Sequence, residues 1–417
     1  SEIDTNYGGV KTLYNKNVEA GAGANGWTDQ LIALPNGRTQ REKNAELVSI
    51  KDFGAKGDGL TSDVAAINAM ASNVNRVHFS DGTYLIDSTL TINKPVSFSP
   101  NAKIKLANNA KVYFDVGTCD KICAHWFSSA NPIQDAVISA RDVKRVYVRG
   151  GIWLIDTPII IPSEVAYWGI TIEGSSDSQQ YENLRSSSST TIRANKEMNV
   201  VIGNRLDWRD GSGYYNKVKN LTIDGNNLAK YGYINGYQDT LTGVNVTLCK
   251  IGGIIFGRLS NSTKLENVSS TKNGNGLILT GLPPEGASTH ALIDNSRFRQ
   301  NIGAGVVFAQ ALGVEFTNCV IESNTAEGIR VKKALETDDY YAGEAAFIHQ
   351  IYFDRCGMES NGRLMALDGT GLGLSFIEFA KCNLAGKTAD KLNPVADIYT
   401  KSVRGLIFDY CTMLNIG

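Results

Sequence analysis

The sequence predicts an all-β protein built mainly as a single-stranded, right-handed parallel β-helix, a solenoid that follows a short N-terminal neck and a capping helix. Two internal repeats carry this prediction. A Phe-x-x-Cys pattern recurs at residues 316–319, 353–356, 379–382 and 408–411. A Gly-apolar-x-apolar pattern recurs at residues 253–256, 276–279, 305–308 and 328–331, with starts 23, 29 and 23 residues apart. A period in the twenties without helical segments is typical of a coil made of three short strands.

The composition agrees with short strands joined by tight turns. The chain has 417 residues, with 42 glycines, which tolerate the positive φ angles of turns, and 9 prolines. Its 41 basic and 42 acidic residues nearly balance, so no basic surface is expected for a nucleic acid partner. No apolar run approaches the roughly 18 residues of a membrane span, so no membrane partner is expected either.

Three regions follow one another along the chain. Residues 1–46 are polar and rich in turn signals, and they predict an N-terminal neck or leader. Residues 47–95 predict the N-terminal cap of the β-helix, in which a glycine-rich loop precedes a short helix with Val64, Ile67 and Ala71 on one face. Residues 96–417 consist almost entirely of short strand patterns and predict the right-handed parallel β-helix itself.

Equivalent residues of successive coils are expected to form columns, because parallel strands stack about 4.8 Å apart. The four cysteines of the Phe-x-x-Cys repeat would form one buried core column. Asparagines that recur just before the second strand pattern would form a ladder at a turn; they are Asn273, Asn301, Asn324 and Asn361. The seven cysteines are odd in number and widely scattered, so no disulfide framework is expected, and neither a metal site nor a cofactor is indicated.

One segment near the N-terminus resembles a known family. Residues 52–59 read Asp-Phe-Gly-Ala-Lys-Gly-Asp-Gly, followed by Thr-x-Asp-x-Ala-Ala-Ile at 61–67 and Val-x-Phe-x-x-Gly-x-Tyr-Leu-Ile at 77–86. This segment resembles the beginning of the pectate-lyase-like β-helix superfamily, in the branch common among bacteriophage tailspikes and capsule depolymerases. The motif is specific for the fold and weak for chemistry, because that branch contains hydrolases, lyases and adhesive proteins.

The resemblance implies a homotrimer of parallel β-helices that stands on a virion. It implies attachment to a phage tail or baseplate protein through the N-terminal side, and action outside the cell on a bacterial surface polysaccharide such as capsule, exopolysaccharide or O-antigen. It leaves open whether a polysaccharide groove lies within or between subunits. Family members often continue into further C-terminal trimerising domains, which we expect to be either missing from this chain or reduced.

The first candidate site is a pair of glutamates. Hydrolysis of a glycosidic bond requires two carboxyl groups, about 5–5.5 Å apart in retaining enzymes and about 6.5–9.5 Å apart in inverting ones. Glu322 and Glu359 each stand two residues before a ladder asparagine, so they are expected to stack in neighbouring coils. Their repulsion would favour protonation of one, which suits an acid catalyst. Arg299 holds the same position one coil lower and would tune the pair or bind an acidic sugar; the alternative is a solvated charge ladder or an Arg299–Glu322 salt bridge.

The second candidate site lies in an insertion of about 14 residues, 333–346, which lengthens one coil. Insertions in a solenoid form flanking loops that often carry the binding face. Its candidate catalysts are Asp338, Asp339 and Glu344, and its candidate sugar-stacking rings are Tyr340 and Tyr341. The alternative is an exposed acidic loop or a contact between subunits of the trimer.

Other residues have weaker claims. Asp207 and Trp208 begin a polar, glycine-containing segment in which the indole would serve as a sugar platform or would equally pack against a neighbouring subunit. Asp224 and Asp294 end predicted strands and are interpreted as turn-forming residues. His290 makes no metal-spaced pair with another histidine.

These candidates predict a phage tailspike endo-glycosidase that depolymerises a surface polysaccharide by two-carboxylate acid–base hydrolysis. A polysaccharide lyase that acts by β-elimination on a uronate is the first alternative, to which His290, Arg299 and Tyr340 would contribute. A non-catalytic receptor-binding spike is the second. The sequence leaves all three open.

Overall fold

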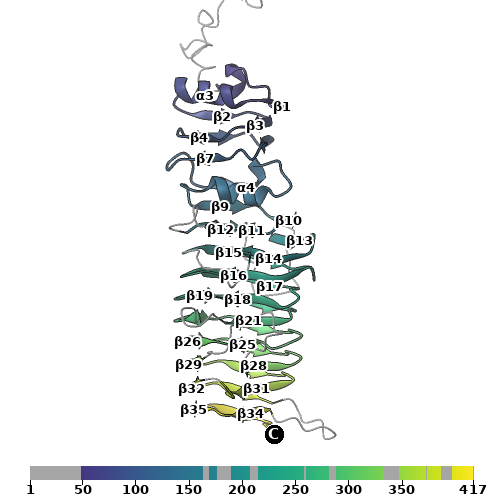
Figure 1. Cartoon of the computed structure of the whole chain (residues 1–417), viewed down its shortest axis with the longest axis vertical. Helices are drawn as coiled ribbons and strands as arrows, with labels where there is room; N and C mark the ends of the chain where they lie inside the picture. The colour runs from purple at the N-terminus through teal and green to yellow at the C-terminus, as the bar shows by residue number, and fades with distance from the viewer. Residues whose placement is uncertain are drawn as a thin grey trace, which may run out of the picture. The chain divides into compact units, whose positions relative to one another are not determined.

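Figure 1 shows a computed structural model of the chain. The structure describes residues 48–162, 169–175, 189–206, 215–257, 260–280, 288–332, 347–371, 373–386 and 397–416. The neck predicted at residues 1–46 lies outside these ranges. The chain divides into two compact units, residues 1–85 with 94–103 and residues 86–93 with 104–417, and each is described by itself.

The first unit contains short strands and one α-helix. Its elements are η1 (Ile50–Phe53), β1 (Asp58–Ser62), α3 (Val64–Asn73), β2 (Val77–Phe79) and β5 (Val96–Phe98), and it contains the first residues of β3 (Gly82–Ile86) and β6 (Ala102–Leu106). The helix expected here is present as α3, and its buried residues are Ala66, Ile67 and Met70. Val64 and Ala71, which were expected on the same face as Ile67, are half-buried.

Two residues of the N-terminal motif have structural roles in this unit. The Oδ1 atom of Asp63 accepts hydrogen bonds from the backbone N of Lys56 and Gly57, at 2.7 and 3.3 Å, and its Oδ2 atom accepts one from Leu85 at 3.0 Å. Gly82 has a φ of 149°, and a Cβ there would lie 2.8 Å from the carbonyl oxygen of Gly57. The buried carboxylate and the bare glycine backbone together hold the glycine-rich loop in place.

The second unit is a parallel β-helix in which successive coils add strands to a nine-stranded sheet and to a twenty-stranded sheet (Figure 1). It begins with β4 (Leu90–Ile92), which pairs with β7 (Val112–Phe114), and it includes η2 (Ala124–Trp126) and α4 (Pro132–Ser139). The nine-stranded sheet consists of β11 (Ile159–Ile160), β14 (Met198–Gly203), β16 (Ala229–Asn235), β18 (Gly252–Phe256), β21 (Asn275–Leu279), β25 (Val306–Phe308), β28 (Glu327–Lys332), β31 (Arg363–Asp368) and β34 (Ile398–Lys401). No helix in the described ranges is long and apolar enough to cross a bilayer.

The twenty-stranded sheet supplies the other strands of each coil. In chain order these are β8 (Ile122–Cys123), β9 (Arg145–Val148), β10 (Gly151–Ile155), β12 (Thr171–Gly174), β13 (Thr190–Ala194), β15 (Lys217–Asp224), β17 (Thr240–Thr247), β19 (Lys264–Glu266), β20 (Ser269–Thr271), β22 (Ser288–Thr289), β23 (Leu292–Asp294), β24 (Arg297–Arg299), β26 (Ala311–Thr317), β27 (Val320–Glu322), β29 (Phe347–Asp354), β30 (Gly357–Glu359), β32 (Gly373–Ala380), β33 (Asn383–Ala385), β35 (Arg404–Asp409) and β36 (Thr412–Leu414). Neighbouring coils pair in parallel, as β26 does with β29 and β29 with β32. The predicted all-β parallel β-helix is therefore confirmed.

Corners divide the twenty-stranded sheet within the later coils. At one corner the residue between two strands has a left-handed backbone, with φ between 44° and 54°; these residues are Asn267, Asn295, Asn318, Arg355, Lys381 and Tyr410. Asparagine is among the few residues that adopt this conformation readily. The corner column separates β26 from β27 and β29 from β30, so each coil presents two differently directed outer surfaces on this sheet.

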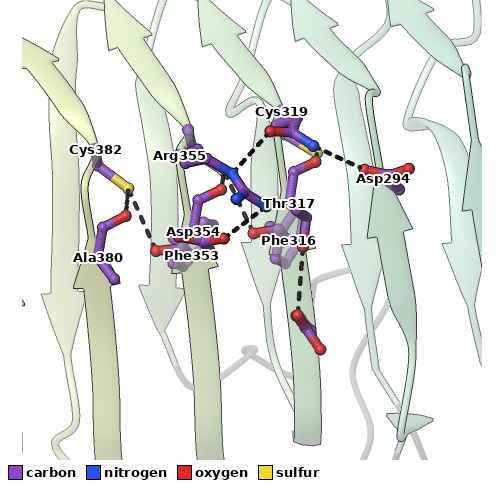
Figure 2. A network of polar contacts seen from close by, with 12 residues as sticks. Asp294, Phe316, Thr317, Cys319, Phe353, Asp354, Arg355, Ala380 and Cys382 are labelled. Atoms are coloured by element: carbon purple, nitrogen blue, oxygen red, sulfur yellow. Dashed lines mark hydrogen bonds and ion pairs between the residues drawn. The ribbon is translucent and has the colours of Figure 1, made fainter.

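Columns of identical side chains fill the core behind this sheet. Stacked rings form one column, with centroids 4.7, 4.7 and 5.2 Å apart along the series Phe316, Phe353, Phe379 and Phe408. The predicted cysteine column is confirmed: Cys319, Cys356 and Cys382 are buried, and Cys411 in the last coil is partly exposed. The thiol of Cys382 donates to the carbonyl oxygen of Phe353 in the preceding coil at 3.3 Å (Figure 2). All seven cysteines are free thiols, as expected.

The predicted asparagine ladder is confirmed, and it satisfies the backbone of a turn. Oδ1 of Asn324 accepts a hydrogen bond from the backbone N of Asn301 at 3.1 Å, and its Nδ2 donates to the carbonyl oxygen of Phe298 at 3.0 Å. Asn361 repeats both contacts one coil further, with the backbone N of Asn324 and the carbonyl oxygen of Ile321. The ladder side chains are buried, and buried backbone groups require partners. The ladder therefore secures this turn in coil after coil.

Replacing Asn324 by alanine should destabilise the β-helix, because the backbone N of Asn301 and the carbonyl of Phe298 would lose a partner in a buried turn. Such a loss costs about 1–3 kcal/mol. The measurement is the free energy of unfolding in urea. The matched control is Asn383→Ala, since Asn383 is exposed on β33. Equal unfolding free energies for the two variants would contradict this role of the ladder.

The core thiols should react slowly in the folded protein. The neighbouring Cys319 thiol and burial raise the pKa of Cys356, and the neighbouring Cys356 thiol and burial raise the pKa of Cys382. Because the thiolate is the nucleophile, both groups should resist a disulfide reagent at about pH 8 until the chain is unfolded, when seven thiols become reactive. The readout is mass-spectrometric mapping of labelled cysteines, with partly exposed Cys411 as the internal comparison. Rapid labelling of Cys356 in the native protein would contradict the core column.

Candidate functional site

The predicted column of Arg299, Glu322 and Glu359 exists. These residues end β24, β27 and β30, respectively. Arg299 is the register partner of Glu322, and Glu322 is the register partner of Glu359. Their Cα atoms are therefore separated by successive strand spacings of about 4.8 Å. The structure brings the three side chains of the first candidate site to one strip of the surface.

The charges in this column are partly paired. Nη1 of Arg299 lies 3.4 Å from Oε1 of Glu322, and the two side chains are 22% and 23% exposed. This contact is the salt bridge that the sequence left as an alternative to catalysis. Glu359 is exposed and, within the part of the chain that the structure describes, has no ion-pair partner. The strip therefore offers one carboxylate held by a guanidinium and a second carboxylate open to solvent.

The same column continues into the earlier coils, where most of it is buried. Its register partners before Arg299 are Thr271, Thr247, Asp224 and Arg193. Asp224 is buried, its Oδ2 accepts from Nε of Arg193 at 2.8 Å, and its Oδ1 accepts from the backbone N of Asn226 at 2.8 Å. The contact two residues along the chain confirms the turn-forming role expected of Asp224. The two threonines and Asp224 thus separate the charged strip at Arg299 from Arg193.

Several predicted site residues lie outside the described ranges. They are Asp338, Asp339, Tyr340, Tyr341 and Glu344 of the insertion, and Asp207 and Trp208. The insertion follows β28, which ends at Lys332, whereas Glu322 comes before β28 begins. The insertion thus lies in sequence between Glu322 and Glu359, the two carboxyl groups of the first candidate site. The roles of these seven residues stay predictions.

The structure does not bring His290 to the Arg299 column. His290 is exposed, has a left-handed backbone with φ 52°, and precedes β23; its backbone N donates to the carbonyl of Leu312 at 2.9 Å. Arg299 ends β24, so all of β23 and the corner at Asn295 separate the two residues. The sequence grouped His290 with Arg299 and Tyr340 as a possible lyase set, and it did not account for the corner between β23 and β24.

A second polar surface, which sequence reasoning missed, lies on the outward side of β26, β29 and β32. We call it the Tyr352 face. Glu315 is the register partner of Tyr352, and Tyr352 is the register partner of Glu378. Each precedes a phenylalanine of the core column, so alternation along the strand directs it outward. The signal was present in the sequence, because the residues on either side of each Phe in the Phe-x-x-Cys repeat form these columns.

A chain of polar contacts borders the Tyr352 face at the corner column (Figure 2). Nη2 of Arg355 lies 2.9 Å from Oδ2 of Asp354, and its Nε donates to Oδ1 of Asn318 at 3.1 Å. Nδ2 of Asn318 in turn donates to Oδ1 of Asp294 at 3.3 Å. The carboxylate of Asp294, which ends β23 directly before the corner at Asn295, is thus bound to the next coil. The guanidinium of Arg355 is occupied by its neighbours.

Another polar cluster is buried, and its members bind one another. The carboxylate of Asp239 is fully buried and accepts four hydrogen bonds, from Tyr233 Oη at 2.8 Å, Asn204 Nδ2 at 2.7 Å, and the backbone N of Asn216 and Gly236 at 2.9 and 2.8 Å. Burial raises the pKa of Asp239, and these hydrogen bonds oppose that shift. The cluster links successive coils, so its role is to stabilise the β-helix. In the described ranges no group of three or more His, Cys, Asp or Glu is arranged to hold a metal ion.

Family comparisons agree with this architecture. Residues 47–118 match the family described as rhamnogalacturonase A/epimerase, pectate lyase-like, and residues 168–335 match the right-handed β-helix region. Together with the stacked parallel coils, these two partial matches show that the chain resembles the pectate-lyase-like, right-handed β-helix proteins. The resemblance inferred from the motif at residues 52–86 is thereby confirmed.

Among individual proteins, the chain is 45% identical to the tail spike protein of an Escherichia phage over 51 residues, which are 12% of this chain and 6% of that protein. The match thus spans a small part of its relative. The chain is also similar to the structure of the Dettilon tailspike protein, at 11% identity over 67% of this chain and 56% of that chain, with a TM-score of 0.39. A mannuronan C-5 epimerase module, AlgE6 of Azotobacter vinelandii, is 14% identical over 88% of this chain and 98% of its own, with a TM-score of 0.36.

Proposed function

We propose that this chain is the polysaccharide-processing β-helix of a bacteriophage tailspike. The local similarity to a phage tail spike protein and the pectate-lyase-like family match support this proposal. The chain would act as a homotrimer on the virion, attached through its N-terminal side to a tail or baseplate protein. Its substrate would be a surface polysaccharide of the host, outside the host cell.

Within that function, we propose hydrolysis by Glu322 and Glu359. The observation that carries this proposal is the register, which stacks Glu322 on Glu359 at one strand spacing with Arg299 beneath them. The Cα atoms of the two residues lie about 4.8 Å apart, and their side chains can bring the carboxyl groups to the separation of about 5–5.5 Å that retaining glycosidases use. Inverting enzymes need a wider gap of about 6.5–9.5 Å to admit a water. We therefore propose a retaining mechanism for this pair.

The surroundings divide the two roles. Arg299 neutralises and orients Glu322, so Glu322 is the nucleophile that attacks the anomeric carbon as the glycosidic C–O bond breaks. Glu359, its register partner one coil further, is the proposed acid that protonates the leaving oxygen. Water then attacks the glycosyl ester of Glu322, giving its proton to Glu359 and restoring both groups. The acids Asp338, Asp339 and Glu344 remain the rival catalytic set.

Glu322→Gln and Glu359→Gln should each slow the shortening of host polysaccharide by about 10²–10⁴-fold, because each removes a nucleophile or proton donor. Size-exclusion chromatography of the polysaccharide gives the rate, and circular dichroism verifies the fold. The matched control is Glu173→Gln, which removes a partly exposed glutamate paired with Arg145 at 3.6 Å on β12. If both active-site variants keep full activity, the pair is not catalytic, and amide variants of the three insertion acids become the next test.

Hydrolysis should produce new reducing ends without the ultraviolet absorbance of an unsaturated uronate. β-Elimination creates a conjugated C=C bond in the product, whereas hydrolysis does not, so absorbance measured during chain shortening separates the two reactions. An absorbing product would establish a lyase. Binding to the polysaccharide with no shortening at all would establish a receptor-binding spike without catalysis.

A further inference from the structure

The Tyr352 face combines exposed aromatic rings with carboxylates at fixed spacing. Tyr352 lies between Glu315 and Glu378 in one outward column. Its side chain is 41% exposed, and that of Phe376, on β32, is 54% exposed. The ring of His349 meets the edge of Phe376 at a centroid distance of 5.4 Å, and its Nδ1 lies 2.6 Å from Oγ of Ser375. These contacts hold the Phe376 ring at the surface while leaving it largely uncovered.

Such a surface suits a carbohydrate. An aromatic ring stacks on the apolar C–H face of a sugar, and a phenol offers an additional polar contact at its edge. Carboxylates accept strong hydrogen bonds from hydroxyl groups. Because Glu315 and Glu378 stand one strand spacing on either side of Tyr352, about 4.8 Å each, a sugar resting on the ring has acceptors on both sides.

Charge narrows the class of carbohydrate. The face carries the carboxylates of Glu315, Asp354 and Glu378. Arg355, which borders the face at the corner, is bound to Asp354 and to Asn318. A uronate or phosphate group would meet the negative charges of Glu315 and Glu378 here, which is repulsive. A second copy presenting this same face would bring carboxylates against carboxylates, so charge also disfavours self-association through it.

We infer that the Tyr352 face is a binding surface for an uncharged stretch of the polysaccharide, with Tyr352 as the stacking residue and Glu315 and Glu378 as hydrogen-bond acceptors. This inference rests on the proposed function and deepens it by naming the sugar chemistry. The face lies on the same coils as Glu322 and Glu359, across the corner at Asn318 and Arg355. It therefore binds the chain beside the catalytic column and takes no part in bond breaking.

The test is the affinity for polysaccharide purified from a bacterial strain whose cells the full protein binds, measured by affinity electrophoresis. Tyr352→Ala should weaken binding at least about tenfold, whereas Tyr352→Phe, which keeps the ring, should stay within about twofold of wild type. Tyr399→Ala is the matched control, since Tyr399 is 39% exposed on β34 in the other sheet. Undiminished binding by Tyr352→Ala, or an equal loss in Tyr399→Ala, would overturn the inference.

Two further measurements separate this inference from the proposed function. If the chain shortens the polysaccharide, Tyr352→Ala should raise KM and leave kcat unchanged, which differs from the loss of kcat expected for Glu322→Gln. A wild-type KM in an active Tyr352→Ala variant would contradict the Tyr352 binding surface and would leave the proposed function intact. Wild-type binding should also change less than about twofold between about 50 mM and 500 mM salt, because an uncharged ligand is not screened. Binding that weakens tenfold with salt, or is lost when uronates of the polysaccharide are chemically reduced, would overturn the charge assignment.

Discussion

The in-register parallel stacking of coils is the constraint on which the rest of this structure depends. Each strand finds its hydrogen-bond partners one coil below and one coil above, so a residue can only occupy a column shared with its equivalents in other coils. The spacing of about 4.8 Å is set by backbone hydrogen bonding and not by the side chains. A residue type that repeats in every coil therefore stacks on identical side chains. A charged residue contacts the side chain at the equivalent position of the next coil.

Two consequences of this constraint stabilise the core. Phenylalanine rings in one column lie flat on each other, as Phe316 does on Phe353 with an interplanar angle of 17°. Buried asparagines in another column serve the backbone of the turn, since each side chain links its own coil to the one before it. The phenylalanine column and the asparagine ladder both require the strand register, because a shift by one residue would turn the core side chains outward. The same register brings Arg299, Glu322 and Glu359 together at the surface.

Much of this could be predicted from the sequence, because the repeats themselves encode the register. Glu322 and Glu359 were expected to stack since both stand at a fixed distance from a ladder asparagine, and the structure has them as partners. The Tyr352 face was missed for a different reason: Glu315 and Glu378 are two coils apart, and the column changes residue type at Tyr352. His290 was misjudged because a repeat gives the order of coils but not the corner that turns one strand away from the next.

The structure thus joins a paired-carboxylate column to an aromatic, acidic surface on the same coils. The proposal that depends most directly on this register is that Glu322 and Glu359 act together as the carboxyl pair of a retaining glycosidase. Proton NMR of the first reducing ends released from the polysaccharide tests this claim most directly. The account predicts that the anomeric configuration of the substrate is retained in the first product. A first product of inverted configuration, or one with an unsaturated sugar at its end, would contradict it.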